Sequence, residues 1–229
     1  MIRTETLIGG ENVNKLRNAR VAVFGIGGVG AACAEALARS GVGHLVLIDP
    51  DTVSESNLNR QLVALRSTVG KNKAQVMKER IADIFPECEV TALPLFYEAG
   101  NADTLPFTGF DGIADCIDTV TSKLLIIRRA RENGVRVISA LGTGNKLHPE
   151  MLELADIYAT SVCPLARVMR KRCRENGIEH LQVVYSREEA RHMTAGEENG
   201  RHPPASMAFV PNAAGMIMAS KLVRDIIGE

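Results

Sequence analysis

The feature that most constrains this chain is a glycine run, Gly25-Ile26-Gly27-Gly28-Val29-Gly30, set between an apolar run and a segment of small residues. The spacing G-x-G-x-x-G is typical of a tight turn between a buried strand and a helix, where glycines let the backbone approach a phosphate. The helix N-terminus adds unpaired N–H groups and the positive end of a dipole. We therefore favour a nucleotide site here over a turn without a ligand. The candidate binding residues in the turn are Gly25, Gly27, Gly28 and Gly30.

Apolar, β-branched runs alternate with helical patterns through the first 141 residues. Short continuous apolar strands separated by helices indicate a parallel sheet that is covered on both faces. The predicted fold class is α/β, a Rossmann-like doubly wound, mainly parallel sheet. The predicted strands are 20–25, 44–49, 89–93, 110–117 and 135–141, and the predicted helices are 29–40, 71–84 and 121–133.

After Leu141 the pattern changes to a Gly/Pro/Asn loop followed by further elements. We expect a C-terminal α/β elaboration, and a single domain over 1–229 because no linker separates its core (about 18–145) from the extension (146–229). The segments predicted in the extension are a strand at 150–159, a helix at 164–176, a strand at 181–185, a long polar loop at 187–204 and a helix at 210–227.

Composition narrows the possible partners. The 27 basic and 27 acidic residues cancel, so nucleic acid or an anionic membrane would have to be held by a local patch. No apolar run is long enough for a transmembrane helix, and no signal peptide opens the chain. The five cysteines are scattered, without a C-x-x-C pair, which is typical of the reducing cytoplasm and argues against a paired-cysteine zinc site.

Acidic residues follow two predicted strands. Asp49 lies about twenty residues beyond Gly30, where an acid accepts hydrogen bonds from both ribose hydroxyls of a nucleotide. Asp118 comes at the end of a later strand, on the edge where open α/β sheets bind ligands, so it can carry Mg²⁺. Asp115, three residues earlier, would face the opposite side of an extended strand.

The segment after Asp49 is rich in amides and cations. Asp51 is followed by Ser56-Asn57-Leu58-Asn59-Arg60-Gln61, and Lys73 lies on the next helix. A redox dinucleotide needs few cations, whereas a triphosphate under attack develops charge that Arg and Lys side chains and a metal can stabilise. The pattern therefore favours nucleotidyl transfer over a nicotinamide-dependent oxidoreductase, which the glycine turn alone would suggest.

These segments together resemble the ubiquitin-activating-type adenylyltransferase superfamily. GIGGVG, LIDPD, SNLNRQ, Lys73 and DCID occur in the order of that superfamily over residues 1–145. The resemblance implies that ATP binds here, that a carboxylate attacks its α-phosphorus to give an acyl-adenylate and pyrophosphate, and that a homodimer forms. It implies nucleotide contacts by the glycine turn, Asp49, Asp51, Asn57, Asn59 and Gln61, catalytic roles for Arg60, Lys73 and Asp118, Mg²⁺ at Asp118, and an Arg3 that reaches the partner subunit's ATP.

Two branches of the superfamily then compete. One activates the C-terminus of a ubiquitin-like or sulfur-carrier protein and often carries two C-x-x-C pairs, which this chain lacks. The other is the tRNA threonylcarbamoyladenosine dehydratases, to which RTETLIG, GVGHLVLID, ALRSTVGKNKAQVMKERI and the C-terminal tail are similar. That resemblance spans the whole chain and implies ATP-dependent cyclisation of threonylcarbamoyladenosine at position 37 of tRNA, with a sulfur-transfer protein as a further partner.

A basic helix offers a local patch for RNA. On a helix from Pro164, four cations share one face by the 3.6-residue period: Arg167, Arg170, Lys171 and Arg174. The other face holds Leu165, Val168, Met169 and Cys173. A phosphate-binding stripe and an ordinary solvated face both fit this pattern.

The remaining candidates are weaker. Cys33 and Cys116 are expected to be packed thiols, and Cys163 can be exposed, although no sequence neighbour marks it as a nucleophile. Gly142-Thr143-Gly144 either lines the substrate pocket or forms a simple turn. The histidines lack metal-ligand spacing: we expect His148 in a turn and His192 and His202 in a solvated loop.

Overall fold

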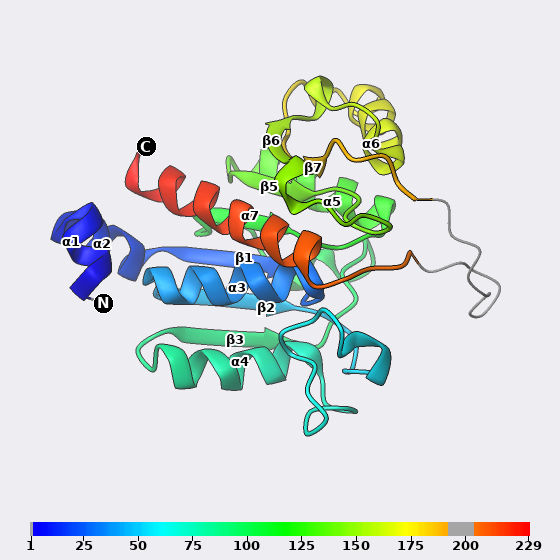
Figure 1. The fold of residues 1–229 in the computed structure, drawn as a ribbon. Helices are drawn as coiled ribbons and strands as arrows, with labels where there is room; N and C mark the ends of the chain where they lie inside the picture. Colours follow the sequence, from blue (N-terminus) through cyan, green and yellow to red (C-terminus); the bar gives the residue numbers. More distant parts are fainter. Residues whose placement is uncertain (1, 192–203) are drawn as a thin grey trace.

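The computed structural model describes residues 2–191 and 204–229, and its centre is one seven-stranded sheet with the strand order β3-β2-β1-β4-β5-β7-β6 (Figure 1). All neighbouring strands are parallel except β6 and β7, which pair antiparallel. The strands are β1 (Arg20–Phe24), β2 (His44–Ile48), β3 (Glu89–Leu93), β4 (Gly112–Asp115), β5 (Val137–Ala140), β6 (Leu152–Asp156) and β7 (Gln182–Ser186). The predicted α/β class and mainly parallel sheet are confirmed.

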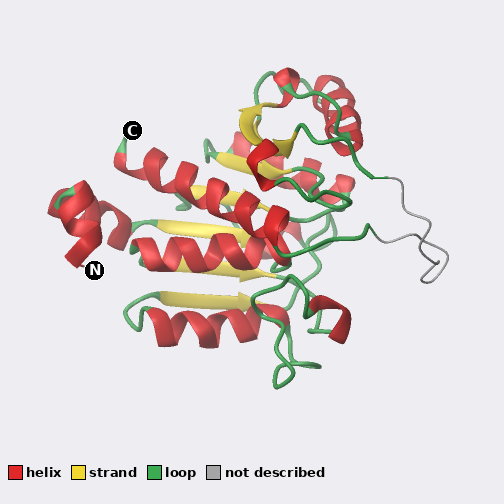
Figure 2. Ribbon diagram, viewed as in Figure 1, coloured by secondary structure: helices red, strands yellow, loops and turns green. Residues whose placement is uncertain are grey.

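Helices lie on both faces of the sheet (Figure 2). The helices α3, α4 and α7 share one apolar cluster with one face, and α5 packs on the other. The helices are α1 (Ile2–Ile8), α2 (Gly10–Asn18), α3 (Gly28–Ser40), α4 (Lys73–Ile84), α5 (Val120–Glu132), α6 (Pro164–Glu175) and α7 (Phe209–Ile227).

Strand alternation decides which face each residue covers. In β1, Val21 and Val23 belong to the cluster under α3 and α7, whereas Ala22 and Phe24 belong to the cluster under α5. This is the period-2 pattern of a strand whose two faces are both buried. Between β3 and β4 no helix crosses over. Instead, a connection with a short 3₁₀ helix (Ala102–Thr104) contributes aromatic rings to the cluster under α5.

The small residues predicted in the glycine-turn helix allow it to lie close to the C-terminal helix. A Cβ built on Gly215 of α7 would lie 2.3 Å from the carbonyl oxygen of Val29 in α3. Because no side chain fits in that space, Gly215 lets the two backbones meet. The close approach brings the start of α7, where Pro211 faces Gly28, beside the glycine turn.

The structure departs from the predicted elements in three places. The helices α1 and α2 were not predicted. The strand predicted over 150–159 is limited to β6, with short 3₁₀ helices at Pro149–Met151 and Ile157–Ala159 on either side. The strand predicted over 110–117 ends at Asp115. Most of the loop predicted at 187–204, with His192 and His202, lies outside the described residues.

A helix that crosses a membrane must be both long and apolar. Across residues 2–191 and 204–229, no helix combines the length and apolarity needed to cross a bilayer.

Candidate active site

The glycine turn has the geometry that the sequence predicts. Gly25 follows β1 with φ of 86°, a left-handed conformation that favours glycine. A Cβ on Gly30 would lie 1.7 Å from the carbonyl oxygen of Gly25, so only a glycine allows α3 to start this close to β1. The turn therefore brings the first N–H groups of α3 to the carboxyl edge of the sheet.

A cavity of about 520 Å³ opens at this edge. It collects residues from the ends of β1, β2 and β4, from the start of α4 and from the segment before it. Its lining includes most of the predicted site: Gly25, Gly27, Gly28, Asp49, Asp51, Asn57, Arg60, Gln61, Lys73 and Asp118. The carboxyl edge of an open α/β sheet is where such folds bind ligands.

Asp49 follows β2 and is buried at the wall of the cavity. Its Oδ2 accepts a hydrogen bond from the Ile26 N–H at 2.5 Å, and its Oδ1 accepts one from the Asp51 N–H at 2.8 Å. Burial raises the pKa of this carboxyl, while the two backbone N–H bonds and the charge of Lys73 oppose that rise. The carboxylate thus links the glycine turn to the end of β2 and has lone pairs left for a ligand.

Lys73 is the first residue of α4, and its side chain is buried at the cavity. Its Nζ donates to Asp51 Oδ2 at 2.9 Å, and the Asp51 side chain is largely exposed. A buried ammonium held by one exposed carboxylate keeps two further N–H donors. It can therefore direct them at a phosphate in the cavity.

The amide-rich segment separates into residues that face the cavity and residues that support it. Asn57 Oδ1 accepts from the Ser54 N–H at 3.1 Å and closes a short 3₁₀ helix. Arg60 Nη1 donates to the Ser56 carbonyl oxygen at 2.8 Å. Gln61 Oε1 is buried and has no hydrogen-bond partner among the described residues, which leaves it free for a ligand.

Asp118 is exposed at the cavity, in the loop between β4 and α5. Because β4 ends at Asp115, strand alternation does not reach Asp118. Asp115 is completely buried, contacts Lys123 of α5 and does not line the cavity. The prediction that the two acids face opposite sides of one strand therefore does not apply.

The donor set at Asp118 suits a magnesium ion. Mg²⁺ is usually held by one or two carboxylates together with substrate phosphates and waters, and Asp118 supplies one carboxylate beside the phosphate-side cations. Among the described residues, no group of three or more histidine, cysteine or acidic side chains is placed to hold a metal. A metal at Asp118 would therefore have to take its remaining ligands from substrate phosphates and water.

Three predicted residues do not line the cavity. Gly30 is buried behind the turn, where its role is packing. Asn59 donates to the Ser206 carbonyl oxygen and accepts from Arg60, so it supports the wall. Arg3 is exposed on α1, which lies at the amino ends of the strands (Figure 1), whereas the cavity opens at their carboxyl ends and does not include Arg3.

The cavity also has lining residues beyond the predicted set. Thr143 and Gly144, after β5, line the cavity. Of the two interpretations of this segment, a pocket wall and a simple turn, the structure therefore favours the first. Phe96 and Tyr97 follow β3, and their position after a strand end was the signal that could have identified them. Other lining residues that were not among the predicted site residues include Leu95, Ser122, Pro204, Ser206 and Pro211.

The cysteines are free thiols in the described structure. Cys33 is buried, as expected, whereas Cys116 is only partly buried and lines the cavity. A hydrogen bond with Cys33 and burial raise the pKa of Cys116, which disfavours its thiolate. Cys163 is 2% exposed, which corrects the expectation that it can be exposed. It packs with Ala166 and Met169 of α6 against the far part of the sheet.

The basic helix predicted after Pro164 is α6. Arg167, Lys171 and Arg174 are exposed, but Arg170 Nη1 donates to the Thr160 carbonyl oxygen at 2.8 Å. Val168 was assigned to the apolar face and is instead 45% exposed beside these cations. The exposed basic face therefore consists of three cations and one apolar side chain.

The site and the sheet together define a class: a doubly wound α/β nucleotide-binding protein whose cavity, at the carboxyl edge of the sheet, is lined by Arg60, Lys73 and Asp118. A model of the ThiF family matches residues 2–229, and the chain belongs to that family.

Relatives cover most of this chain. It is 42% identical to a tRNA threonylcarbamoyladenosine dehydratase of Bacillus subtilis, across 99% of this chain and 94% of that protein. It is 39% identical to the Escherichia coli dehydratase, across 76% of this chain and 65% of that protein. Crystal structures of the Escherichia coli enzyme TcdA with AMP and with ATP superpose with TM-scores of 0.91 and 0.90, at 32% identity and over 94% and 93% of the solved chains.

Proposed function

We propose that this protein is an ATP-dependent dehydratase that cyclises threonylcarbamoyladenosine at position 37 of tRNA. The observation that carries the proposal is the convergence of the glycine turn, Asp49, Arg60, Lys73 and Asp118 on one cavity. Its support comes from full-length relatives named for this activity, one of which is solved with ATP and with AMP. A cavity of this kind fits a nucleoside triphosphate and the carboxylate that attacks it.

The reaction divides into two substitutions. The threonyl carboxylate attacks the α-phosphorus of ATP, giving an acyl-adenylate and releasing pyrophosphate. The carbamoyl nitrogen then attacks the acyl carbon, which closes a ring and releases AMP. The attacking nitrogen already belongs to the substrate, so the enzyme needs no nucleophile of its own, and positioning supplies the advantage.

Each residue of the site has a role that follows from its position in the cavity. Asp49 accepts from the ribose hydroxyls, and the first N–H groups of α3 face the phosphates. Arg60 and Lys73 stabilise the charge that develops on the leaving pyrophosphate. Asp118 would hold Mg²⁺, which would supply Lewis-acid catalysis to the phosphoryl transfer.

Further parts of the proposal concern partners and location. The exposed basic face of α6 fits the phosphate backbone of tRNA. We propose a homodimer in which Arg3 reaches the partner subunit's ATP, because α1 has no buried residue in the single chain. A sulfur-transfer protein as an additional partner and a cytoplasmic location complete the proposal and rest on family resemblance and scattered free thiols.

The decisive experiment supplies tRNA carrying threonylcarbamoyladenosine, ATP and Mg²⁺ to the purified protein. We expect AMP, pyrophosphate and the cyclised nucleoside, detected by nucleoside mass spectrometry, and loss of all three in Asp118→Ala. An unchanged nucleoside, or ADP as product, contradicts the proposal. Pyrophosphate exchange that depends on a carrier protein ending in Gly-Gly would instead support activation of a carrier, and tight dinucleotide binding without ATP affinity would support a redox enzyme.

A further inference from the structure

One asparagine hydrogen-bonds to both backbone polar groups of Ala205, and we call this pair of bonds the bracket. The Asn145 N–H donates to the Ala205 carbonyl oxygen at 2.6 Å, and Asn145 Oδ1 accepts from the Ala205 N–H at 2.7 Å. One residue thus satisfies both backbone groups of another, which fixes the position and the orientation of the segment around Ala205. Pro204 and Ser206, on either side of it, line the cavity.

The conformation of Asn145 makes this bracket possible. Its φ is 59°, in the left-handed region, which asparagine tolerates better than other side chains that have a Cβ. In that conformation its N–H and side-chain oxygen reach the same neighbour. A glycine at this position would adopt the left-handed backbone conformation but would lack the side-chain acceptor. An aspartate would keep the acceptor and would also adopt this conformation more readily than most residues.

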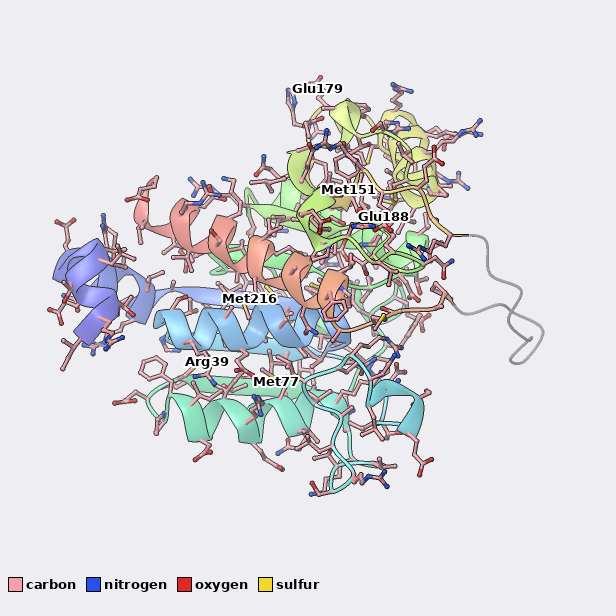
Figure 3. All side chains as sticks on the ribbon, in the orientation of Figure 1. Arg39, Met77, Met151, Glu179, Glu188 and Met216 are labelled. Carbon is pink, nitrogen blue, oxygen red and sulfur yellow. The ribbon has the colours of Figure 1, made fainter. Side chains whose placement is uncertain are left out.

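The turn that carries Asn145 is held from behind. The Lys146 side chain is buried, and its Nζ donates to the carbonyl oxygens of Gly142 at 3.0 Å and Ser186 at 3.3 Å. Two backbone N–H groups just after it donate to the Glu188 carboxylate, which Figure 3 labels beyond β7. Asn145 therefore belongs to a fixed support and can act as an anchor.

On its other side the same segment reaches the phosphate-directed cations. Asn59 Nδ2 donates to the Ser206 carbonyl oxygen at 2.8 Å, and Asn59 Oδ1 accepts from Arg60 Nη1 at 2.9 Å. Hydrogen bonds, together with the peptide bond between Ala205 and Ser206, thus connect one path along the cavity wall: Asn145, Ala205, Ser206, Asn59 and Arg60. It begins beside Thr143 and Gly144 and ends at a cation predicted to be catalytic.

We propose that Asn145 is a positioning residue that holds the Pro204–Ser206 wall against the cavity and, through Asn59, aligns Arg60 for the adenylation step. The inference rests on the proposed function and deepens it. Pro204 and Ser206 line the cavity together with Thr143 and Gly144. Because the proposed function assigns the ribose to Asp49, the proposal places the acyl substrate and the leaving group beside this wall. Its effect is therefore on turnover of tRNA rather than on capture of ATP.

The test compares Asn145→Gly, which removes the acceptor without straining the backbone, with Asn145→Asp, which restores it. We expect kcat/KM for tRNA to fall about tenfold in Asn145→Gly, the rate equivalent of a lost hydrogen bond to a fixed backbone group, with ATP affinity unchanged. Asn145→Asp should retain most of the activity. Asn133→Gly, which removes a local side-chain bond at the end of α5, is the matched control and should leave kcat/KM unchanged.

Hydrogen exchange provides a readout that does not depend on activity. The Ala205 amide should exchange faster in Asn145→Gly than in the wild type and remain protected in Asn145→Asp. If Asn145→Gly does not fold, Asn59→Ala, which cuts the same path at its other end, should lower kcat/KM for tRNA with ATP affinity unchanged.

The outcomes separate the two proposals. Equal turnover in the glycine and aspartate variants, a parallel loss of ATP affinity, or unchanged exchange at Ala205 would overturn the role of Asn145. A wild-type protein that leaves the nucleoside unchanged would instead overturn the proposed function, and the exchange comparison would still report whether the bracket exists.

Discussion

Lys123 Nζ lies 3.0 Å from Asp115 Oδ2, and both side chains are completely buried. The same ammonium donates to Ser139 Oγ at 3.1 Å and to the Ala140 carbonyl oxygen at 2.7 Å, so its three donors are satisfied. This cluster joins α5 to the ends of β4 and β5. It therefore fixes the loop between β4 and α5 that presents Asp118.

Removing only one partner of this buried ion pair should destabilise the folded protein. We expect Lys123→Met to lower the free energy of unfolding by about 3–5 kcal/mol, because it leaves a buried carboxylate without its partner. Replacing both charges, in Lys123→Met with Asp115→Leu, should cost less than the single change. Urea unfolding of the three proteins measures this, and a single variant as stable as the wild type would show that the carboxyl finds other partners.

The phosphate-directed cations should affect chemistry more than stability. Arg60→Ala and Lys73→Ala should each lower the adenylation rate by the equivalent of about 2.7–4 kcal/mol, as other charge-stabilising donors do. Lys78→Ala, on the exposed side of the same helix as Lys73, is the control. The measurement is AMP formation with saturating tRNA, and near-normal turnover of either variant would mean that the phosphates lie elsewhere.

The ion-pair cluster between α3 and α4 predicts a pH dependence of stability. Glu35 accepts from Arg39 Nε at 2.8 Å and from Arg80 Nε at 2.5 Å (Figure 3 labels Arg39). Burial pushes the pKa of this carboxyl upward, but the hydrogen bonds and charges of Arg80 and Arg39 outweigh it and hold the pKa below its ordinary value of 4.5. The ionised form is thus favoured by folding, so its contribution is present above that ordinary value and is lost as pH falls through the folded-state pKa.

The corresponding variant is Glu35→Gln. It should be less stable than the wild type at neutral pH, and the difference should shrink as the solution becomes more acidic than pH 4.5. Urea unfolding over a pH series measures it, with the exposed Glu79→Gln as the control. A difference that stays constant down to strongly acidic pH would contradict a role for the charge.

Local sequence patterns predict much of the fold, but they do not predict every residue of the site. Continuous apolar strands and the glycine turn locate β1, β2 and β3 within a residue of their bounds, because those signals are set by near neighbours. The helices α1 and α2 carry weak local signals, with no buried residue in α1 and two in α2. We propose a single folding unit, since β7 of the extension pairs directly with β5.

Some residues of the site are likewise predictable from local sequence, and others are not. Asp49, Lys73 and Asp118 could be placed because each follows a strand or begins a helix on the binding edge. Asn59 was expected at the nucleotide, yet its partner is Ser206, 147 residues away in the chain. Neither this contact nor the bracket at Asn145 has a signal in local spacing, because each depends on tertiary packing of the C-terminal segment.

The exposed basic face of α6 predicts a salt-dependent interaction with tRNA. Replacing Arg167, Lys171 and Arg174 with alanine should weaken tRNA binding and reduce the slope of log affinity against log salt by about 0.7–0.9 for each phosphate that is no longer neutralised. ATP affinity should not change. Arg172→Ala is the control on the same helix. Lys171 and Arg172 both contact Glu175, at 3.9 and 3.1 Å, but the helical period places Arg172 off the face that the three cations share. A slope equal to that of the wild type would place the RNA on another surface.

The position of Arg3 predicts that two defective subunits can complement each other. Arg3 lies on α1, whose Ile2 and Leu7 side chains are 82% and 84% exposed in the single chain, as expected of a surface that a partner covers. If Arg3 acts across a two-fold dimer, an Arg3→Ala subunit keeps its own Asp118 and receives Arg3 from an Asp118→Ala partner. Random mixing makes about half of the dimers mixed, each with one complete site, so activity should recover to about one quarter of the wild-type value. Each variant alone should be inactive, and a mixture as inactive as its components would show that Arg3 serves its own subunit or none.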